Sequence, residues 1–312
     1  MTKLIVFDKI FTIIYYGDYM KTQKKSELLL IISMFVFGTI GLFIKNIPLS
    51  SGEIALYRAI LAIIFIGIYL IITKSKISFS LIKKSLPYLL ISGMAMGINW
   101  ILLFESYKYT TVSIATLSYY FAPIIVTIVS SFLFKEKLSL KQIICFIGST
   151  IGLILITGVN TSTSNNLIGI LLGVGAAIFY ATVILLNKFI KDVSGVHRTF
   201  LQFISSTFIL IPYVLFSSGI NILSLNSNGL INMLIVGFIH TGITYVLYFS
   251  SIKDLSGQKI GILSYIDPLV AIIVSFVFLN ESMNFIQIIG GLFILCFTLL
   301  NEIKNKKHKQ DE

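Results

Sequence analysis

The chain is poor in charged residues, cysteine and histidine, and these scarcities argue against several classes of protein. Charged side chains make up 12% of its 312 residues, against about 25% in an ordinary soluble domain, too few to coat a surface in water. A soluble enzyme and a disordered chain are therefore disfavoured. Two cysteines, Cys145 and Cys296, both lie within apolar runs, which indicates small core residues rather than a disulfide scaffold or a metal site.

Apolar sequence, in contrast, is abundant. Hydrophobic residues make up 56% of the chain, and its mean hydropathy is +0.94. They gather in runs that are each near the ~20 residues a membrane-spanning helix needs. The predicted fold class is an all-α polytopic membrane protein with ten transmembrane helices. The expected spans lie near 27–44, 53–73, 86–107, 112–134, 140–158, 167–188, 197–217, 229–252, 257–280 and 284–302.

The two ends of the chain are expected to lie outside the spans. Residues 1–26 form a predicted cytoplasmic segment without the apolar stretch and cleavage site of a secretory signal peptide. Met20, followed by Lys21, offers a natural start, so residues 1–19 are expected to be an extension or an interfacial segment. Residues 303–312 are expected to be a basic cytoplasmic tail.

In a soluble protein, the net charge of +11 would suggest a nucleic-acid partner. Here the basic residues gather on one side of the expected membrane. Of the 24 Lys and Arg residues, 21 fall in the segments on one side of the expected spans, whereas Lys45 and Lys108 fall on the other and Arg58 lies within a span. The positive-inside rule then predicts a multi-pass protein of the cell membrane with both termini in the cytoplasm. No nucleic-acid partner is expected.

The chain also repeats itself without a gap at an offset of 145 residues. Matches such as Pro123 with Pro268 and Glu136 with Glu281 share one register with Gly, Phe, Ser, Lys, Tyr and Gln matches. The predicted repeats are 27–158 and 167–302. Because each holds five spans, the second must be inverted in the bilayer, an arrangement that permits alternating access to a central site.

Several short stretches carry a resemblance to a known family. They are Asn99-Trp100 followed by Phe104-Glu105-Ser106, the prolines Pro123 and Pro268, Phe-Leu-Phe-Lys-Glu ending at Glu136, Phe-Leu-Asn-Glu ending at Glu281, and a helix with Gly148, Gly152 and Gly158. Together with the doubled five-helix unit, they resemble the EamA group of the drug/metabolite transporter superfamily over residues 27–302. Two positions depart from the pattern, because Cys145 matches Gly290 and Gly152 matches Phe297 at the repeat offset.

The resemblance implies a fold and a general activity. It implies that helices three, four, eight and nine, with parts of one and six, line a central cavity. It is specific for transport but poor for substrate, because such proteins are similar to exporters of amino acids, other metabolites and drugs.

An ionisable group within a span is expensive and therefore a candidate for function. Asp267 lies ~15 Å into its span, near the midplane, and precedes Pro268, where the helical hydrogen bonds must break. It is predicted either to couple transport to protons or another cation, or to cap the helix that restarts there. His240 lies at a similar depth and is a candidate protonatable partner of Asp267 or substrate donor, or a histidine satisfied by a neighbouring helix.

Arg58 is the cation within a span. A structural ion pair with Glu105 is the expected role, with recognition of an anionic substrate as the alternative. In the second repeat, the neutral Gln202 lies near the equivalent place.

Two aromatic pairs are related by the repeat, Trp100 with Tyr245 and Tyr120 with Tyr265. Inversion predicts Trp100 in the outer third and Tyr245 in the inner third, as opposed gates of one cavity, and Asn99 could bond the substrate there. Packing within the bundle is the alternative role. Glu136 and Glu281 are expected to cap the helices that follow them.

The sequence as a whole predicts a secondary active transporter, and specifically an exporter of a small metabolite such as an amino acid or an amphipathic drug-like solute. No Walker-type phosphate loop is present, and neither a cofactor, a metal nor an enzymatic activity is expected. The expected partners are the solute, the lipid bilayer and protons, with the chain as a monomer or homodimer. An integral membrane enzyme, a lipid-handling protein and a passive channel are the alternatives.

Overall fold

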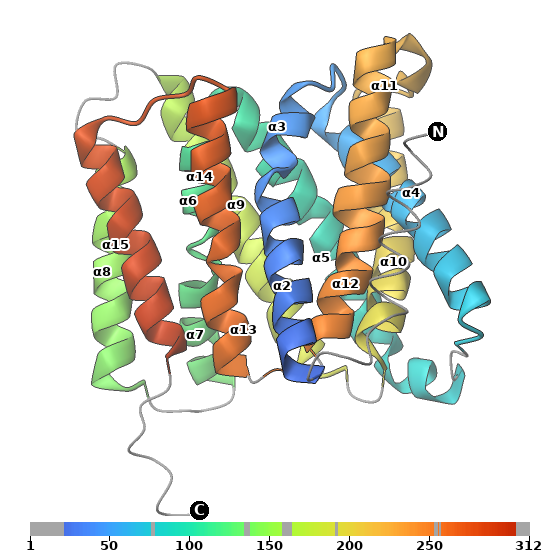
Figure 1. The fold of residues 1–312 in the computed structure, drawn as a ribbon, viewed down its shortest axis with the longest axis horizontal. Coiled ribbons are helices and arrows are strands. Elements are labelled where there is room, and N and C mark those ends of the chain that lie inside the picture. The colour runs from blue at the N-terminus through green and yellow to red at the C-terminus, as the bar shows by residue number, and fades with distance from the viewer. Residues whose placement is uncertain are drawn as a thin grey trace, which may run out of the picture.

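The computed structural model describes residues 22–75, 79–133, 138–157, 164–190, 193–252, 255 and 257–303. The expected N-terminal extension, Glu136, Gly158 and nearly all of the predicted basic tail lie outside these residues. Within them, every regular element is a helix (Figure 1). The α-helices are α2 (Thr22–Gly38), α3 (Ile40–Lys45), α4 (Ser51–Ile72), α5 (Phe79–Tyr109), α6 (Val112–Tyr119), α7 (Ala122–Leu133), α8 (Leu140–Thr157), α9 (Ser164–Asn187), α10 (Gly195–Ser217), α11 (Ser227–Leu234), α12 (Thr244–Ser251), α13 (Gly257–Ser264), α14 (Ile266–Phe278) and α15 (Phe285–Glu302).

These helices form the spans of a multi-pass membrane protein. Eight helical segments of the described chain are long and apolar enough to cross a membrane, and two shorter apolar helices cover 140–156 and 262–278. Four spans are composite: α2 with α3, α6 with α7, α13 with α14, and α11 with α12. The last pair is joined by a π-helix, Ile235–Ile243.

The two repeats run in opposite directions through the bundle. In chain order, α6 precedes α7 and α13 precedes α14, yet Figure 1 shows α6 above α7 and α13 below α14. The bounds of α6 and α13 differ by 145 at both ends, as do those of α8 and α15. The fold therefore confirms the predicted inverted duplication of five helices.

The first span of each repeat packs on the other repeat. Helix α2 contacts α12, α13 and α14, whereas α9 contacts α5, α6 and α7. We call α2, its continuation α3, α12, α13 and α14 the α2 bundle, and we call α5, α6, α7 and α9 the α9 bundle. Each bundle therefore combines helices from both repeats, and side chains between the bundles lie at the centre of the molecule.

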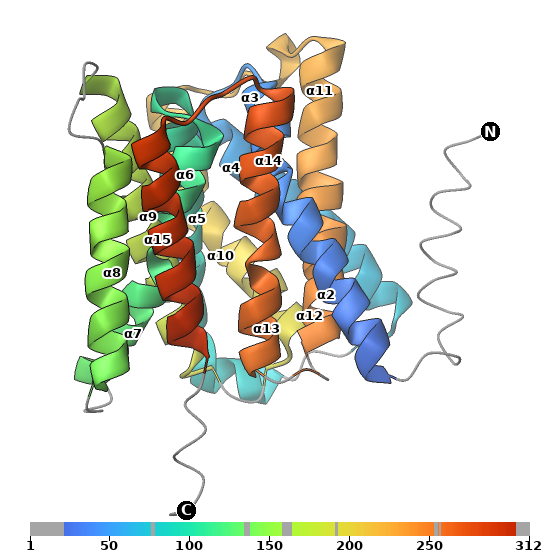
Figure 2. The same ribbon diagram turned by 60° about the vertical axis from the view of Figure 1, so that its left-hand side comes forward.

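The fifth and tenth spans, α8 and α15, form a tight pair of their own at one side of the molecule (Figure 2). A Cβ added to Gly152 would lie 2.7 Å from the Gly290 carbonyl oxygen, and one added to Gly290 would lie 2.7 Å from the Gly152 carbonyl oxygen. Phe297 lies against Gly148 in the same interface. Phe297, the large residue at one of the two departures from the repeat pattern, is therefore accommodated by a glycine of the other helix.

Side-chain contacts tie the bundles at one end of the molecule. Glu281, in the loop after α14, forms an ion pair with Lys45 and accepts hydrogen bonds from the Val112 backbone N–H at 2.8 Å and from Ser275 Oγ at 2.5 Å. Val112 is the first residue of α6, so the carboxylate lies at the positive end of that helix. The expected capping of the following helix is therefore wrong for Glu281, because Asn284 and Gln287 form the capping box of α15. We name this the Glu281 end.

The opposite end carries an ion pair between Glu27 of α2 and Lys259 of α13, and we name it the Glu27 end. Both ion pairs join the first span to the ninth. The α2 bundle is therefore fastened within itself at both ends.

Gly152→Ala is expected to lower the thermal stability of the purified protein, because the added methyl would meet backbone and force α8 and α15 apart. Overpacking of this kind costs about 1–3 kcal/mol. The matched control is Gly67→Ala, where the added Cβ would lie an ordinary 3.5 Å from Phe200. Melting of both variants in detergent checks the comparison, and equal midpoints would show that α8 and α15 do not need this close approach.

Candidate substrate site

Asp267 is the second residue of α14, next to the interruption of the ninth span at Tyr265. Its Oδ2 accepts a hydrogen bond from the Tyr120 hydroxyl at 2.8 Å. Tyr265, which precedes α14, makes no side-chain cap, and the carboxylate of Asp267 is directed to Tyr120 of the other repeat. Asp267 is partly exposed, and a carboxylate at this depth is stable only where it faces protein or water rather than lipid.

Four tyrosines lie within electrostatic range of this carboxylate, and a fifth, Tyr248, lies within range of two of them; we call the five and Asp267 the tyrosine cluster. The α9 bundle contributes Tyr119, Tyr120 and Tyr180, and the α2 bundle contributes Tyr245 and Tyr248. The rings of Tyr119 and Tyr180 are 5.2 Å apart, and those of Tyr119 and Tyr120 are 6.2 Å apart. All five keep part of their surface exposed, and Tyr180 and Tyr245 lie within electrostatic range of Asp267.

Three interruptions of the helices meet beside the cluster. A Cβ at Gly38, where α2 ends, would lie 2.5 Å from the Asp267 carbonyl oxygen, so only glycine permits this approach. The next residue, Thr39, shares a hydrogen bond of 2.9 Å with His240 Nε2 in the π-helix. The first span therefore contacts the helix interruptions of both the eighth and the ninth spans.

The fourth span is interrupted in the same way as the ninth. Helix α6 ends at Tyr119, and α7 begins at Ala122, so Pro123 is its second residue. Pro268 is the third residue of α14. In each case the proline lies in a first helical turn, where its missing N–H would have no partner in the helix.

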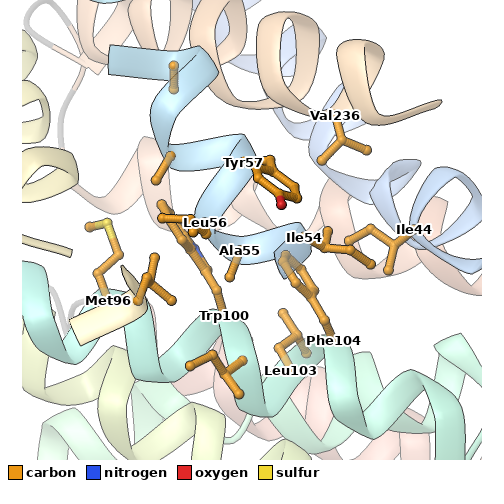
Figure 3. Close-up of a cluster of buried hydrophobic side chains, with 14 of the residues drawn as sticks. Ile44, Ile54, Ala55, Leu56, Tyr57, Met96, Trp100, Leu103, Phe104 and Val236 are labelled. Carbon is orange, nitrogen blue, oxygen red and sulfur yellow. The ribbon is translucent and has the colours of Figure 1, made fainter. Parts of the chain in front are cut away.

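Arg58 lies deep between α4 and α5, 3% exposed. Its Nε donates to Thr241 Oγ1 in the π-helix at 3.0 Å. Its guanidinium carbon lies 4.3 Å from the Trp100 ring centroid and 5.2 Å from that of Phe104. Figure 3 shows Trp100 and Phe104 pointing from α5 toward α4, so aromatic faces and a hydroxyl hold the cation.

The expected ion pair of Arg58 with Glu105 is absent from the part of the chain that the structure describes. Glu105 instead accepts a hydrogen bond from Ser51 Oγ at 2.5 Å and pairs with Lys108 at 2.9 Å. Ser51 begins α4, and Arg58 is two turns further along that helix, ~10 Å deeper. Ser51 therefore holds the Glu105 carboxylate at the rim of the bundle. Arg58 lies deeper, at the level of Trp100 and Phe104.

At the repeat offset of 145, the position equivalent to Arg58 is Phe203 rather than the neighbouring Gln202. Phe203 contacts Tyr245 at 5.2 Å between ring centroids, just as Arg58 contacts the equivalent Trp100. The rings of Trp100 and Phe203 are themselves 5.3 Å apart. The two pairs thus form one continuous row of tilted and edge-on ring contacts through Phe203. Trp100 and Tyr245 are therefore not gates that face each other across an open space.

The remaining candidates are buried. Asn99, 2% exposed, donates to the Ala176 carbonyl oxygen of α9 at 2.7 Å. His240, also 2% exposed, bonds Thr39 and lies 4.9 Å from the Phe43 ring centroid. Tyr265 packs among apolar side chains of α6, α8 and α15, 6.1 Å from the ring of Tyr120. In this conformation, all three join helices to one another rather than line an accessible surface.

A pocket of about 390 Å³ lies at the Glu281 end, away from the tyrosine cluster. Apolar side chains and the two lysines Lys45 and Lys108 line it, together with Phe104, whose ring also lies beside Arg58. Both lysines are engaged by carboxylates, Lys45 by Glu281 and Lys108 by Glu105. The pocket is therefore a hollow at the rim of the bundle with both polar and apolar lining.

Sequence reasoning missed five contributors: Thr39, Tyr119, Tyr180, Thr241 and Tyr248. Tyr248 could have been found, because it lies one helical turn from Tyr245 on the same face. Tyr119 directly precedes the predicted Tyr120. Thr39 and Thr241 depend on helix interruptions that the apolar pattern conceals, and Tyr180 gave no signal.

An all-helical bundle with two inverted repeats and a partly exposed carboxylate at its centre is the architecture of a membrane transporter. The model of the EamA-like transporter family matches residues 24–158 and again 167–302. The chain belongs to this family. The family's members are transporters. Among the residues that the structure describes, no group of three or more His, Cys, Asp or Glu side chains could hold a metal ion.

Two relatives and one solved structure agree with this placement. The chain is 33% identical to the uncharacterized transporter YxxF of Bacillus subtilis (strain 168) over 293 residues, 92% of each chain. It is 24% identical to an uncharacterized transporter of Archaeoglobus fulgidus, covering 90% of this chain and 98% of the relative. One crystal structure superposes with a TM-score of 0.62 at 14% identity, over 88% of this chain and 96% of that one, and shows the likeness of fold.

Thr241→Val is expected to destabilise the protein, because it removes the acceptor of the buried Arg58 Nε. A buried charged donor left without a partner costs about 1–3 kcal/mol or more. Thr150→Val is the matched control. Both hydroxyls donate to a carbonyl oxygen of their own helix, Thr241 to Val236 and Thr150 to Phe146, but Thr150 is partly exposed and has no part in holding Arg58. Thermal melting compares the two, and an equal effect would show that Arg58 does not depend on Thr241.

Proposed function

We propose that this protein is a secondary active exporter of a small metabolite, such as an amino acid or an amphipathic drug-like solute. We propose that alternating access moves the α2 and α9 bundles relative to each other, with protons as the coupling ion. The observation that carries the proposal is the hydrogen bond of 2.8 Å between Tyr120 of the α9 bundle and Asp267 of the α2 bundle.

This hydrogen bond links the two bundles at the depth where the solute would bind. Parting the bundles there breaks the bond, and its strength depends on the charge of Asp267 because an ionised acceptor bonds more strongly than a neutral one. A proton or a solute that arrives at Asp267 therefore changes the balance between conformations. This differential interaction is what coupling by population shift requires.

The supporting geometry extends to the rest of the cluster. Tyrosines of both bundles lie within electrostatic range of the carboxylate and keep part of their surface exposed. The helices that carry these residues are the fourth, sixth, eighth and ninth spans, with Phe37 of the first span 5.1 Å from the Tyr245 ring centroid. A solute at this place would touch both bundles, as a carrier requires.

Asp267→Asn is expected to reduce proton-gradient-driven transport by about tenfold or more, because an amide cannot take up and release the coupling proton. Purified protein is first screened by thermal shift against amino acids and aromatic amines, since a ligand of the folded state raises its stability. The hits are then tested in proteoliposomes, both with a pH gradient and in counterflow without one.

Counterflow separates the steps of this proposal. Retained counterflow with lost gradient-driven flux identifies Asp267 as the coupling group, and unchanged gradient-driven flux rejects that role. Glu105→Gln is the control, because Glu105 is an ion-paired carboxylate at the rim. Accumulation of labelled solute by exchange also distinguishes a carrier from a passive channel, which cannot perform it.

We further propose that the protein resides in the cell membrane with the Glu27 end and both termini in the cytoplasm. In a variant without its own cysteines, Ser224→Cys at the Glu281 end is expected to react with an impermeant maleimide in intact cells. Ser75→Cys, equally exposed but at the Glu27 end, is expected to react only after permeabilisation. The reverse pattern would invert the orientation.

A further inference from the structure

The tyrosine cluster has an uneven charge. Asp267 is its only carboxylate, and in the described chain none of the ion pairs includes it. Its side-chain hydrogen-bond partner is the Tyr120 hydroxyl, which is neutral. An ionised Asp267 would thus leave one unbalanced negative charge at the centre of the bundle.

The buried cation Arg58 does not neutralise this charge. It is held by Thr241 and by the face of Trp100, at the far end of the row of rings Trp100, Phe203 and Tyr245. Tyr245 lies within electrostatic range of both Arg58 and Asp267. The site therefore has a polarity, with its negative pole among the tyrosines of the α9 bundle.

The tyrosines themselves favour a cation. An aromatic ring presents a negative face, and a cation within about 6 Å of its centroid is attracted to it. The ring of Tyr119 lies 6.2 Å from that of Tyr120 and 5.2 Å from that of Tyr180 between centroids, on the side of the cluster from which Tyr120 reaches Asp267. Several aromatic faces around one carboxylate form a recognisable receptor for an ammonium group or a larger organic cation.

We propose that the tyrosine cluster is a binding site for a monovalent organic cation, with Asp267 as its counter-ion and the rings of Tyr119, Tyr120 and Tyr180 as its walls. The inference rests on the proposed transport function and adds the sign of charge of the solute. An anion of the same shape as the cation would find no positively charged side chain among the tyrosines of this cluster. The site is therefore selective for charge more than for the outline of the ligand.

A pair of probes with nearly the same shape and opposite charge tests this selectivity. Radiolabelled tetraphenylphosphonium and tetraphenylborate are measured by equilibrium binding to the full chain in lipid nanodiscs, and empty discs provide the background for partition into lipid. Saturable binding of the phosphonium at one site per chain, without saturable binding of the borate, is the expected result. Equal binding of the two ions overturns the proposal.

Three substitutions locate the site. Asp267→Asn is expected to weaken phosphonium binding about tenfold or more, because the counter-ion is lost. Tyr180→Leu should weaken it about fivefold through loss of a ring face, and Tyr180→Phe should bind within about twofold of the native chain. Tyr109→Leu, at an exposed tyrosine ending α5, is the control and should have no effect.

The outcomes separate this inference from the transport proposal. If Asp267→Asn fails to fold, the Tyr180 pair decides, and equal binding by the Leu and Phe variants overturns the inference. Counterflow of a metabolite by a protein that does not bind the phosphonium also overturns it, while transport stands. Charge-selective binding that depends on Asp267 and the Tyr180 ring supports the inference even in a protein that shows no flux.

Discussion

The close approach of Gly38 to the Asp267 carbonyl group is the contact on which the centre of this protein depends. Backbone groups freed by an interrupted helix cannot be exposed to lipid, so interruptions must be gathered in the interior. Here the end of α2, the π-helix and the start of α14 meet, and Thr39 and His240 bond across the junction. A side chain at position 38 would separate α2 from α14, and with it the frame that presents the Asp267 carboxylate.

The inverted repeats supply a symmetric scaffold, and the chemistry lies where the repeats differ. At the offset of 145, Asp267 corresponds to Ala122, Arg58 to Phe203, and His240 to Ala95. The π-helix has no counterpart, since α5 is continuous through the equivalent residues. Asp267, Arg58 and His240 thus each occur once per molecule. The surrounding framework is duplicated, as in the pairs Tyr120 with Tyr265 and Pro123 with Pro268.

The sequence predicted most of the fold because membrane thickness and charge asymmetry act on whole segments, whereas the site depends on the direction of single side chains. Depth in a span was enough to single out Asp267 and Arg58. It could not tell that Glu105 turns toward Ser51, or that Trp100 lies beneath the guanidinium. The π-helix was also invisible, since the extra residue in its turns leaves the apolar composition of the span unchanged.

The placement of charged and aromatic contacts suits the proposed movement of the α2 and α9 bundles relative to each other. Ion pairs join the first and ninth spans at both ends, within the α2 bundle. Between the bundles, by contrast, lie the ring contact of Tyr120 with Tyr265 and the hydrogen bonds of Asp267 and Glu281. Ring contacts tolerate sliding better than directional ion pairs do. Asp267 and Glu281 are therefore the groups at which a change of charge would most directly release one bundle from the other.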